Sequence, residues 1–168
     1  MSRNIFDYEV TYNGIKELVI DNFKDYLTLE MIEDVSNVAY DMLKKDMSFI
    51  ASLDPSQNSI EMVQKTKTKS LIATMCYRIA NTLYYKGYLK EKTDIIPREF
   101  MEKVASQTGI DIHPQAIIGE QFFIDHGVGI VIGATTIIGK CCNIFNNVIL
   151  GSKNVKTAKQ SKRHPTLK

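Results

Sequence analysis

The short stretch "IDHGVG" at residues 124–129 carries side chains that are suited to acid–base chemistry. Histidine is the usual general base near neutral pH when another group orients its ring, and Asp125 directly precedes His126. Asp111 lies fifteen residues before His126, close to one turn of a repeat with about eighteen residues per coil, so it can orient the imidazole. Because no serine or cysteine nucleophile accompanies the pair, the nucleophile is expected to belong to the substrate. A surface histidine in a loop is the alternative interpretation.

The residues around this stretch repeat with a six-residue period. Aliphatic side chains recur at Ile112, Ile118, Ile124, Ile132, Ile138, Ile144 and Leu150. Glycine follows four of them, and a residue that is mostly small or β-branched stands two positions before each. Such hexapeptide repeats are typical of a parallel β-helix, in which each unit supplies a short strand, an inward side chain and a turn. The pattern points Cys142 inward and Cys141 outward, and it assigns no function to Cys141.

The period is interrupted once. Ile124 and Ile132 are eight residues apart, so two extra residues lie between them. An insertion in a solenoid forms a loop on one face, which is often the binding face. We therefore expect Asp125 and His126 to project from the regular wall of the coil.

Residues 1–108 show the apolar periodicity of helices instead. A helix over residues 29–51 is expected to have an apolar face formed by Met31, Val35, Val38, Met42 and Phe49. A helix over residues 70–87 is expected to present Leu71, Met75, Ile79 and Leu83. A third helical segment covers residues 98–109, and the Asp-Pro run at 52–59 is expected to be a loop. The sequence thus predicts a helical oligomerisation domain at 1–108, a β-helix at 109–151 and a basic loop or tail at 152–168.

Composition narrows the possible partners. The formal net charge of +2 is too small to imply binding to nucleic acid or membranes by itself. No apolar run approaches the roughly 20 residues that span a bilayer, and three cysteines without metal-type spacing favour a reducing, cytoplasmic setting. The C-terminal segment is basic but has no aromatic side chain for base stacking, so a solvated loop is expected. Its cations are Lys153, Lys156, Lys159, Lys162, Arg163 and Lys168.

The run "DIHPQAIIG…IDHGVGIVIGATTIIG", followed by "RHP" at 163–165, resembles the serine O-acetyltransferases. The segment "YRIANTLYYKG" at 77–87 is similar to the helix before that family's repeats, and "LDP" at 53–55 stands where the family has an Arg-Asp-Pro loop. The resemblance covers most of residues 30–168. It implies an α+β fold, with an N-terminal α-helical domain followed by a short left-handed parallel β-helix of hexapeptide repeats.

The resemblance also implies the chemistry. His126 would deprotonate the hydroxyl of L-serine, which attacks the thioester of acetyl-CoA, and Asp111 would hold the imidazole and stabilise its charged form. Acetyl-CoA is then a co-substrate whose binding residues remain unassigned, and neither a metal nor a permanently bound cofactor is expected. His113 is expected to shape the corner before Pro114 rather than to take part in catalysis.

Four further residues are implied to bind the amino acid. Asp54 and Asp125 would contact its ammonium group, and Arg163 with His164 would bind its carboxylate, a task that suits a guanidinium. The family forms trimers through the β-helix and pairs the trimers through the helices, with active sites between neighbouring β-helices. A homo-oligomer is therefore expected, as a trimer or a dimer of trimers.

The sequence departs from the family at several positions. Leu53 replaces the usual arginine before Asp54, and Ala134 stands where glutamate is common. Family members continue beyond the point that corresponds to Lys168 with coils that form much of the CoA groove. A tail in these members docks into O-acetylserine sulfhydrylase. The sequence therefore predicts a chain truncated after the second coil, for which that docking is not expected.

Three other functions are compatible with parts of the sequence. A non-catalytic homologue could act as an assembly or regulatory partner through its helices. Another hexapeptide-repeat acyltransferase, acting on a sugar or an antibiotic, would not explain the helical half. A metal-dependent hydratase would need three convergent histidines, and the chain has His113, His126 and His164 alone.

Overall fold

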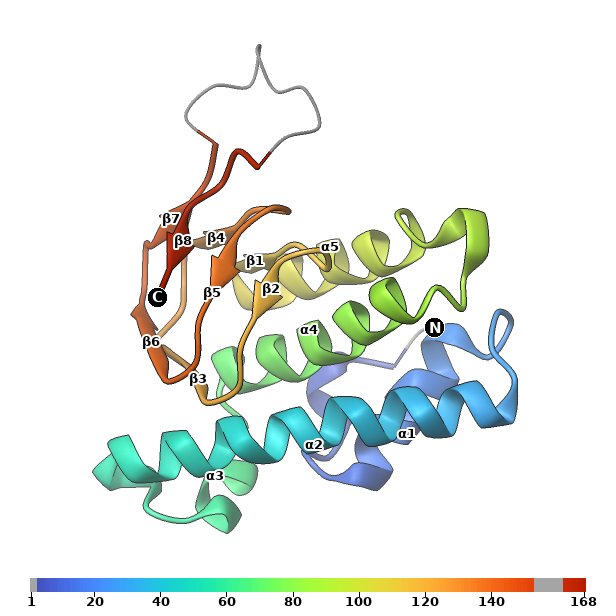
Figure 1. The fold of residues 1–168 in the computed structure, drawn as a ribbon. Coiled ribbons are helices and arrows are strands. Elements are labelled where there is room, and N and C mark those ends of the chain that lie inside the picture. The colour runs from blue at the N-terminus through green and yellow to red at the C-terminus, as the bar shows by residue number, and fades with distance from the viewer. Residues whose placement is uncertain (1–2, 153–161) are drawn as a thin grey trace.

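The computed structural model describes residues 3–152 and 162–168. Of the basic C-terminal segment, Lys153, Lys156 and Lys159 lie outside the described residues. The first two thirds of the chain are helical (Figure 1). The α-helices are α1 (Tyr12–Phe23), α2 (Leu29–Leu53), α3 (Ile60–Thr66), α4 (Lys69–Lys86) and α5 (Ile96–Thr108). Short 3-10 helices are η1 (Ile5–Asp7), η2 (Pro55–Gln57) and η3 (Lys90–Lys92).

Side chains typical of helix caps mark most of the helix ends. A hydroxyl accepts a hydrogen bond from the first turn at the N-caps of α1 to α4, which are Thr11, Thr28, Ser59 and Thr68. At the other end, Gly87 and Gly109 close α4 and α5 with φ of 66° and 75°, which favour glycine. The helix predicted over residues 70–87 is α4, and its predicted end at Gly87 is confirmed.

The packing of α4 follows the predicted pattern, whereas that of α2 is rotated. Leu71, Met75, Ile79 and Leu83 are all buried. On α2, the predicted apolar face is only partly buried except at Val35. The buried face is instead formed by Ile32, Val35, Ala39, Leu43, Met47 and Ile50. Because α2 carries apolar side chains around more than half of its circumference, its contacts with α1 and α4 select the buried stripe.

The rest of the described chain forms a parallel β-helix with three faces. Its strands are β1 (Ile110–Ile112), β2 (Ile117–Ile118), β3 (Phe122–Asp125), β4 (Ile130–Ile132), β5 (Ile137–Ile138), β6 (Cys142–Phe145), β7 (Ile149–Leu150) and β8 (Thr166–Leu167). The faces are β1-β4-β7, β2-β5-β8 and β3-β6, and every pair is parallel. All seven aliphatic side chains of the six-residue period are buried, as predicted.

The register locates the two inserted residues. Ile110 pairs with Ile130, twenty residues later, whereas Val131 pairs with Ile149, eighteen residues later. The longer coil contains residues 126–129, between β3 and β4. The repeat also extends further than predicted, because β8 pairs with β5 and adds a strand within the segment expected to be a loop or tail.

Helix α4 covers the edge of the first coil. Alternate residues of the first coil bond to the second coil, as Ile117 does by donating to Thr136, so the carbonyls that face away from it need other partners. Side chains of α4 supply these partners at 2.7 to 2.9 Å. The donors are Tyr77, Arg78, Asn81 and Tyr85, and the acceptors are the carbonyls of Pro114, Gln115, Ala116, Ile118 and Gly119.

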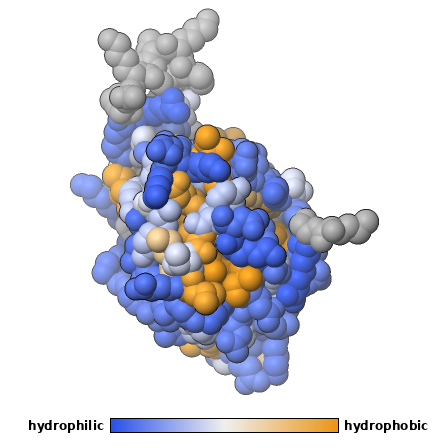
Figure 2. Space-filling view, turned by 90° about the vertical axis from the view of Figure 1, so that its right-hand side faces the viewer, coloured by the Kyte–Doolittle hydropathy of each residue, from blue (hydrophilic) through white to orange (hydrophobic). Residues whose placement is uncertain are grey.

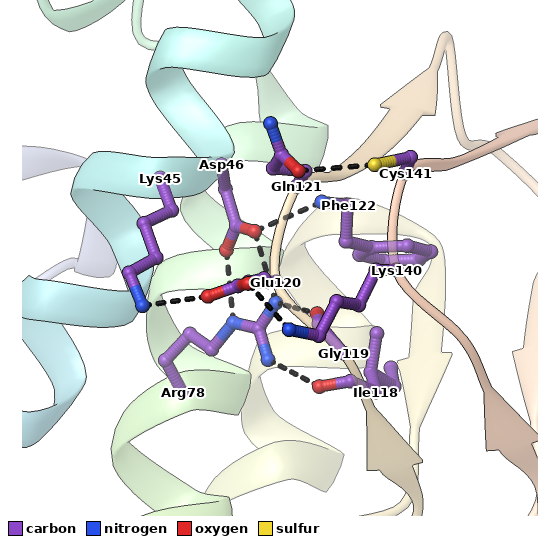
Figure 3. A network of polar contacts seen from close by, with 10 residues as sticks. All are labelled: Lys45, Asp46, Arg78, Ile118, Gly119, Glu120, Gln121, Phe122, Lys140 and Cys141. Carbon is purple, nitrogen blue, oxygen red and sulfur yellow. Dashed lines mark hydrogen bonds and ion pairs between the residues drawn. The ribbon is translucent and has the colours of Figure 1, made fainter.

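A buried ion pair joins the helices to the same coil (Figure 3). The guanidinium of Arg78 donates to both carboxylate oxygens of Asp46, at 2.8 and 3.0 Å. Asp46 also accepts from the amide of Phe122 at 2.9 Å. Outside this pair, Glu120 bridges Lys140 and Lys45, and hydrogen bonds from these two cations lower its pKa to about 2. The start of β3 is thereby held against α2 and α4.

The far end of the helices exposes apolar side chains. Figure 2 shows an apolar area on the side of the molecule where the turns between helices lie. Leu29 follows the α1–α2 turn and Ile95 precedes α5, and they are 79% and 56% exposed. None of the described helices is both long and apolar enough to cross a membrane.

Candidate active site

The inserted residues form a tight corner that presents His126. The backbone of His126 is left-handed, with φ of 62°, and Gly127 and Gly129 follow with φ of 86° and 78°. A Cβ at Gly127 would lie 2.6 Å from Ile110 Cδ1, so the turn packs directly on the core. The His126 side chain is 82% exposed, and its Nε2 lies 3.9 Å from Asp125 Oδ1. His126 therefore projects from the wall as predicted, whereas Asp125 remains in β3 and pairs with Phe145.

Asp111 lies on the neighbouring strand but is bound elsewhere. It faces outward from β1, and Arg98 Nη1 donates to its Oδ1 at 2.7 Å. Asp111 pairs with Val131 in the next coil, five residues beyond His126. One full turn here takes twenty residues, so the fifteen residues between Asp111 and His126 do not bring the two side by side. In the described part of the chain, no hydrogen bond or ion pair joins Asp111 to His126.

The "RHP" loop is attached to a different corner, after β4. Thr135 organises it: its amide donates to His164 Nδ1 at 3.1 Å, and its Oγ1 accepts from the amides of Arg163 and His164 at 3.0 and 3.1 Å. Because Nδ1 is an acceptor, neutral His164 carries its proton on Nε2. The pKa of His164 is lowered by burial and by the charges of Arg163 and Lys162. This ring is therefore a neutral donor beside an exposed guanidinium.

If His164 binds the carboxylate of L-serine, as the family resemblance implies, replacing Gly133 with alanine should weaken that binding without unfolding the coil. The new Cβ would lie 2.2 Å from His164 Nε2, so the loop histidine must move. We expect the KM for L-serine to rise roughly tenfold, the scale of one lost charge-assisted hydrogen bond. Gly151→Ala, at the equivalent position of the next coil, is the control in steady-state assays. An unchanged KM for Gly133→Ala would exclude His164 from the serine site.

His113 lies near both Asp111 and His164. Its Nδ1 accepts from the amide of Gln115 at 3.1 Å, which fits the predicted role in shaping the corner. Burial, followed by the charge of Arg98, lowers its pKa from 6.5 to about 4. Asp111 and His164 also affect this pKa, so both lie within electrostatic range of His113.

The half-buried His113 should make the protein less stable in acid. The unfolded chain protonates His113 below pH 6.5, whereas the folded chain does so only near pH 4. The free energy of unfolding therefore falls as the pH drops through this window. We expect His113→Asn, which keeps an acceptor for the Gln115 amide, to show a smaller fall in melting temperature between pH 7 and pH 4.5. If the melting temperatures of the two proteins fell equally between pH 7 and pH 4.5, His113 would not be the cause of the acid sensitivity.

Asp54 lies in the helical part and is occupied locally. Its carboxylate caps η2 by accepting from the Ser56 amide at 2.8 Å, the Ser56 hydroxyl at 2.6 Å and Gln57 Nε2 at 2.6 Å. The Ser56 and Gln57 side chains, with the Ser56 amide, lower its pKa. Asp54 is thus ionised near neutral pH and fixed in the loop predicted at 52–59.

The candidate residues form two groups on the β-helix. The corner group is Asp125, the last residue of β3, and His126, which follows it. The loop group is Asp111 on β1 together with Arg163 and His164 of the "RHP" loop. Within a single chain, His126 and Arg163 therefore belong to different groups. Among the described residues, no three histidine, cysteine, aspartate or glutamate side chains are grouped to hold a metal ion.

Comparisons with known proteins find chains similar in sequence and fold. No protein-family model matches the chain. Serine acetyltransferase of Bacillus licheniformis is 40% identical over 128 residues, which are 76% of this chain and 55% of that protein. The structure of serine acetyltransferase 1 from Entamoeba histolytica in complex with L-cysteine is 34% identical, with a TM-score of 0.70, and covers 92% of this chain and 58% of that one. A Neisseria gonorrhoeae serine acetyltransferase structure, at 20% identity and a TM-score of 0.71, supports the fold alone.

The fold and the two residue groups define a hexapeptide-repeat protein whose β-helix is capped by helices. The predicted fold class, with a left-handed parallel β-helix after the helices, is confirmed. Over most of its length this chain is similar to serine acetyltransferases. It spans about half the length of the curated relatives it matches.

Proposed function

We propose that this protein transfers the acetyl group of acetyl-CoA to the hydroxyl of L-serine, giving O-acetylserine for cysteine biosynthesis. The observation that carries the proposal is the exposed His126 on the corner where the first coil is lengthened to twenty residues. His126 has a left-handed backbone on this corner, and Gly127 and Gly129 follow it with positive φ. The corner can therefore present the imidazole to a substrate.

The reaction needs few steps. His126 Nε2 or Nδ1 takes the hydroxyl proton of serine while the hydroxyl oxygen bonds to the thioester carbon. The carbon–sulfur bond then breaks, and the CoA sulfur leaves with the proton returned by the imidazolium. Asp111 stabilises the imidazolium. Positioning accounts for much of the rate, because neither reactant needs covalent activation.

The amino acid is held from both sides in this proposal. Asp125 and Asp54 bind its ammonium group. Arg163 and the Nε2–H of His164 bind its carboxylate, consistent with the Thr135 amide occupying Nδ1. Residues that bind acetyl-CoA remain unassigned. The three cysteines are all free, which fits the cytoplasmic location that we infer.

We further infer that the site is built between chains. The corner group and the loop group lie at different corners of one β-helix, so a cyclic trimer can bring the corner group of one copy against the loop group of the next. The apolar area around Leu29 and Ile95 suits pairing of such trimers through their helices. The expected assembly is a trimer or a dimer of trimers.

The test is release of CoA thiol from acetyl-CoA by the purified protein, with and without L-serine. Serine-dependent release that is lost in His126→Asn supports the proposal. Hydrolysis independent of serine, or no release from a folded assembly, contradicts it. The second result would favour a non-catalytic assembly partner instead.

Mixing two inactive variants tests whether the site is shared. His126→Asn damages the corner group, and Arg163→Met damages the loop group. Each chain of a mixed trimer has one defect, so a site within one chain never recovers. A site between chains is intact at about one quarter of the interfaces in an equal mixture. Coexpression should therefore restore up to that fraction of activity, and a mixture as inactive as its parents would contradict a shared site.

A further inference from the structure

Arg98 contacts the candidate site but is absent from the residues implied by the family resemblance. It lies in the first turn of α5, thirteen residues before Asp111. Gly109 ends α5 and reverses the chain, so that β1 packs back along the helix. The Arg98 side chain is only 27% exposed, and it forms ion pairs with Asp111 and Glu102. The helical domain thereby reaches the outer face of the β-helix.

The contact engages one oxygen of Asp111 and leaves the other available. Arg98 Nη1 lies 2.7 Å from Oδ1, whereas Nη2 lies 3.4 Å from Oδ2 and forms its closer ion pair with Glu102. The second bond is long by the usual criteria. Within the described residues, Oδ2 has no other donor. An ionised carboxylate accepts several hydrogen bonds, so Oδ2 can accept from an imidazole N–H.

We propose that Arg98 is a positioning residue of this site, which holds Asp111 through Oδ1 so that Oδ2 orients the imidazole of His126 from an adjacent copy. This inference rests on the proposed function and deepens it. The Nη1–Oδ1 hydrogen bond and the Nη2 ion pair with Glu102 hold the guanidinium at two points, which a single ammonium would do less precisely. The orientation of the base is then set by α5, through a residue that does not touch the substrate.

The charge of Arg98 also affects the histidines near Asp111. Four groups affect the charge of His113, which directly follows β1: Arg98 on α5, Asp111, Asp94 before α5 and His164 in the loop. Arg98 is the largest charge contribution to the lowered pKa of His113, after burial. Without Arg98, the carboxylate of Asp111 would favour the imidazolium form of His126 more strongly. The base would then lose its proton only at higher pH.

The test compares Arg98→Met, Arg98→Lys and Glu102→Gln in the assembled protein. We expect Arg98→Met to lower kcat about 10- to 100-fold with the KM for L-serine changed less than about threefold, because a small misplacement of the base is costly. In a plot of kcat/KM against pH, the rise on the acidic side should move to higher pH. Arg98→Lys should recover part of both effects, and Glu102→Gln should resemble the unaltered protein. Arg98→Met with normal kcat and an unshifted rise on the acidic side overturns the inference.

An NMR titration separates this inference from the proposed function. The chain has three histidines, so the imidazole resonances can be assigned with His113→Asn and His126→Asn. The midpoint of the His126 resonance should rise in Arg98→Met, even if the protein does not acetylate serine. An unchanged midpoint overturns the role of Arg98, whatever the outcome of the assay. A shifted midpoint without serine-dependent thiol release supports Arg98 and contradicts the proposed function.

Discussion

Replacing His126 with asparagine is expected to lower the turnover of serine acetylation about 10²- to 10⁴-fold while the protein stays folded. The loss follows from removing the only proton acceptor on the lengthened corner that is suited to neutral pH. Asparagine is the appropriate replacement because it tolerates the left-handed backbone that His126 adopts at φ of 62°. The side chain is 82% exposed, so its removal leaves no cavity.

A matched control exists on another corner. Cys141 is also exposed and left-handed, with φ of 57°, but belongs to neither residue group. Cys141→Asn should retain normal turnover and a normal melting temperature. Both variants are to be compared by initial rates at saturating L-serine and acetyl-CoA and by thermal melting. If His126→Asn kept more than a tenth of the turnover, another group would have to remove the serine proton.

Replacing Arg78 with methionine is expected to reduce the free energy of unfolding by about 3 to 5 kcal/mol, the usual cost of breaking a buried ion pair. Asp46 is 0% and Arg78 3% exposed, so the variant leaves a carboxylate in the interior without its partner. It also removes the donors to the carbonyls of Ile118 and Gly119, at the edge of the first coil. Urea denaturation measures the change.

The exposed ion pairs of Glu120 with Lys45 and Lys140 serve as a comparison for the buried pair of Arg78 and Asp46. Lys45→Gln removes a bond to Glu120 at the surface and should cost less than about 1 kcal/mol. A double-mutant cycle of Arg78→Met with Asp46→Asn should give a large coupling energy, because each partner's loss includes the other's unpaired charge. If Arg78→Met cost no more than Lys45→Gln, the helices would not depend on this pair for their attachment.

Several features of the fold were predictable because they depend on local periodicity. The seven inward aliphatic side chains identified the β-helix, since a side chain every six residues has no counterpart in helices or sheets of other folds. The gap between Ile124 and Ile132 located the lengthened coil. The end of α4 followed from Gly87.

Other features were missed because they depend on neighbours distant in sequence. The buried stripe of α2 was selected by contacts with two other helices. Strand β8 is only two residues long and has no inward aliphatic pattern before it, so its pairing with β5 gave no local signal. Arg98 could have been noticed as a cation on the segment that precedes "DIHP", but nothing in the sequence shows that β1 folds back along α5.

The sequence by itself determined the class of fold, the lengthened corner and the residue types of the site, because each depends on the order of side chains along a repeat. Only the tertiary structure decided how these residues are grouped. The length of the coil sets Asp111 beside Val131, Thr135 holds His164 at another corner, and α5 brings Arg98 to Asp111. These relations arise from the packing of coils and helices on one another, which has no period in the sequence.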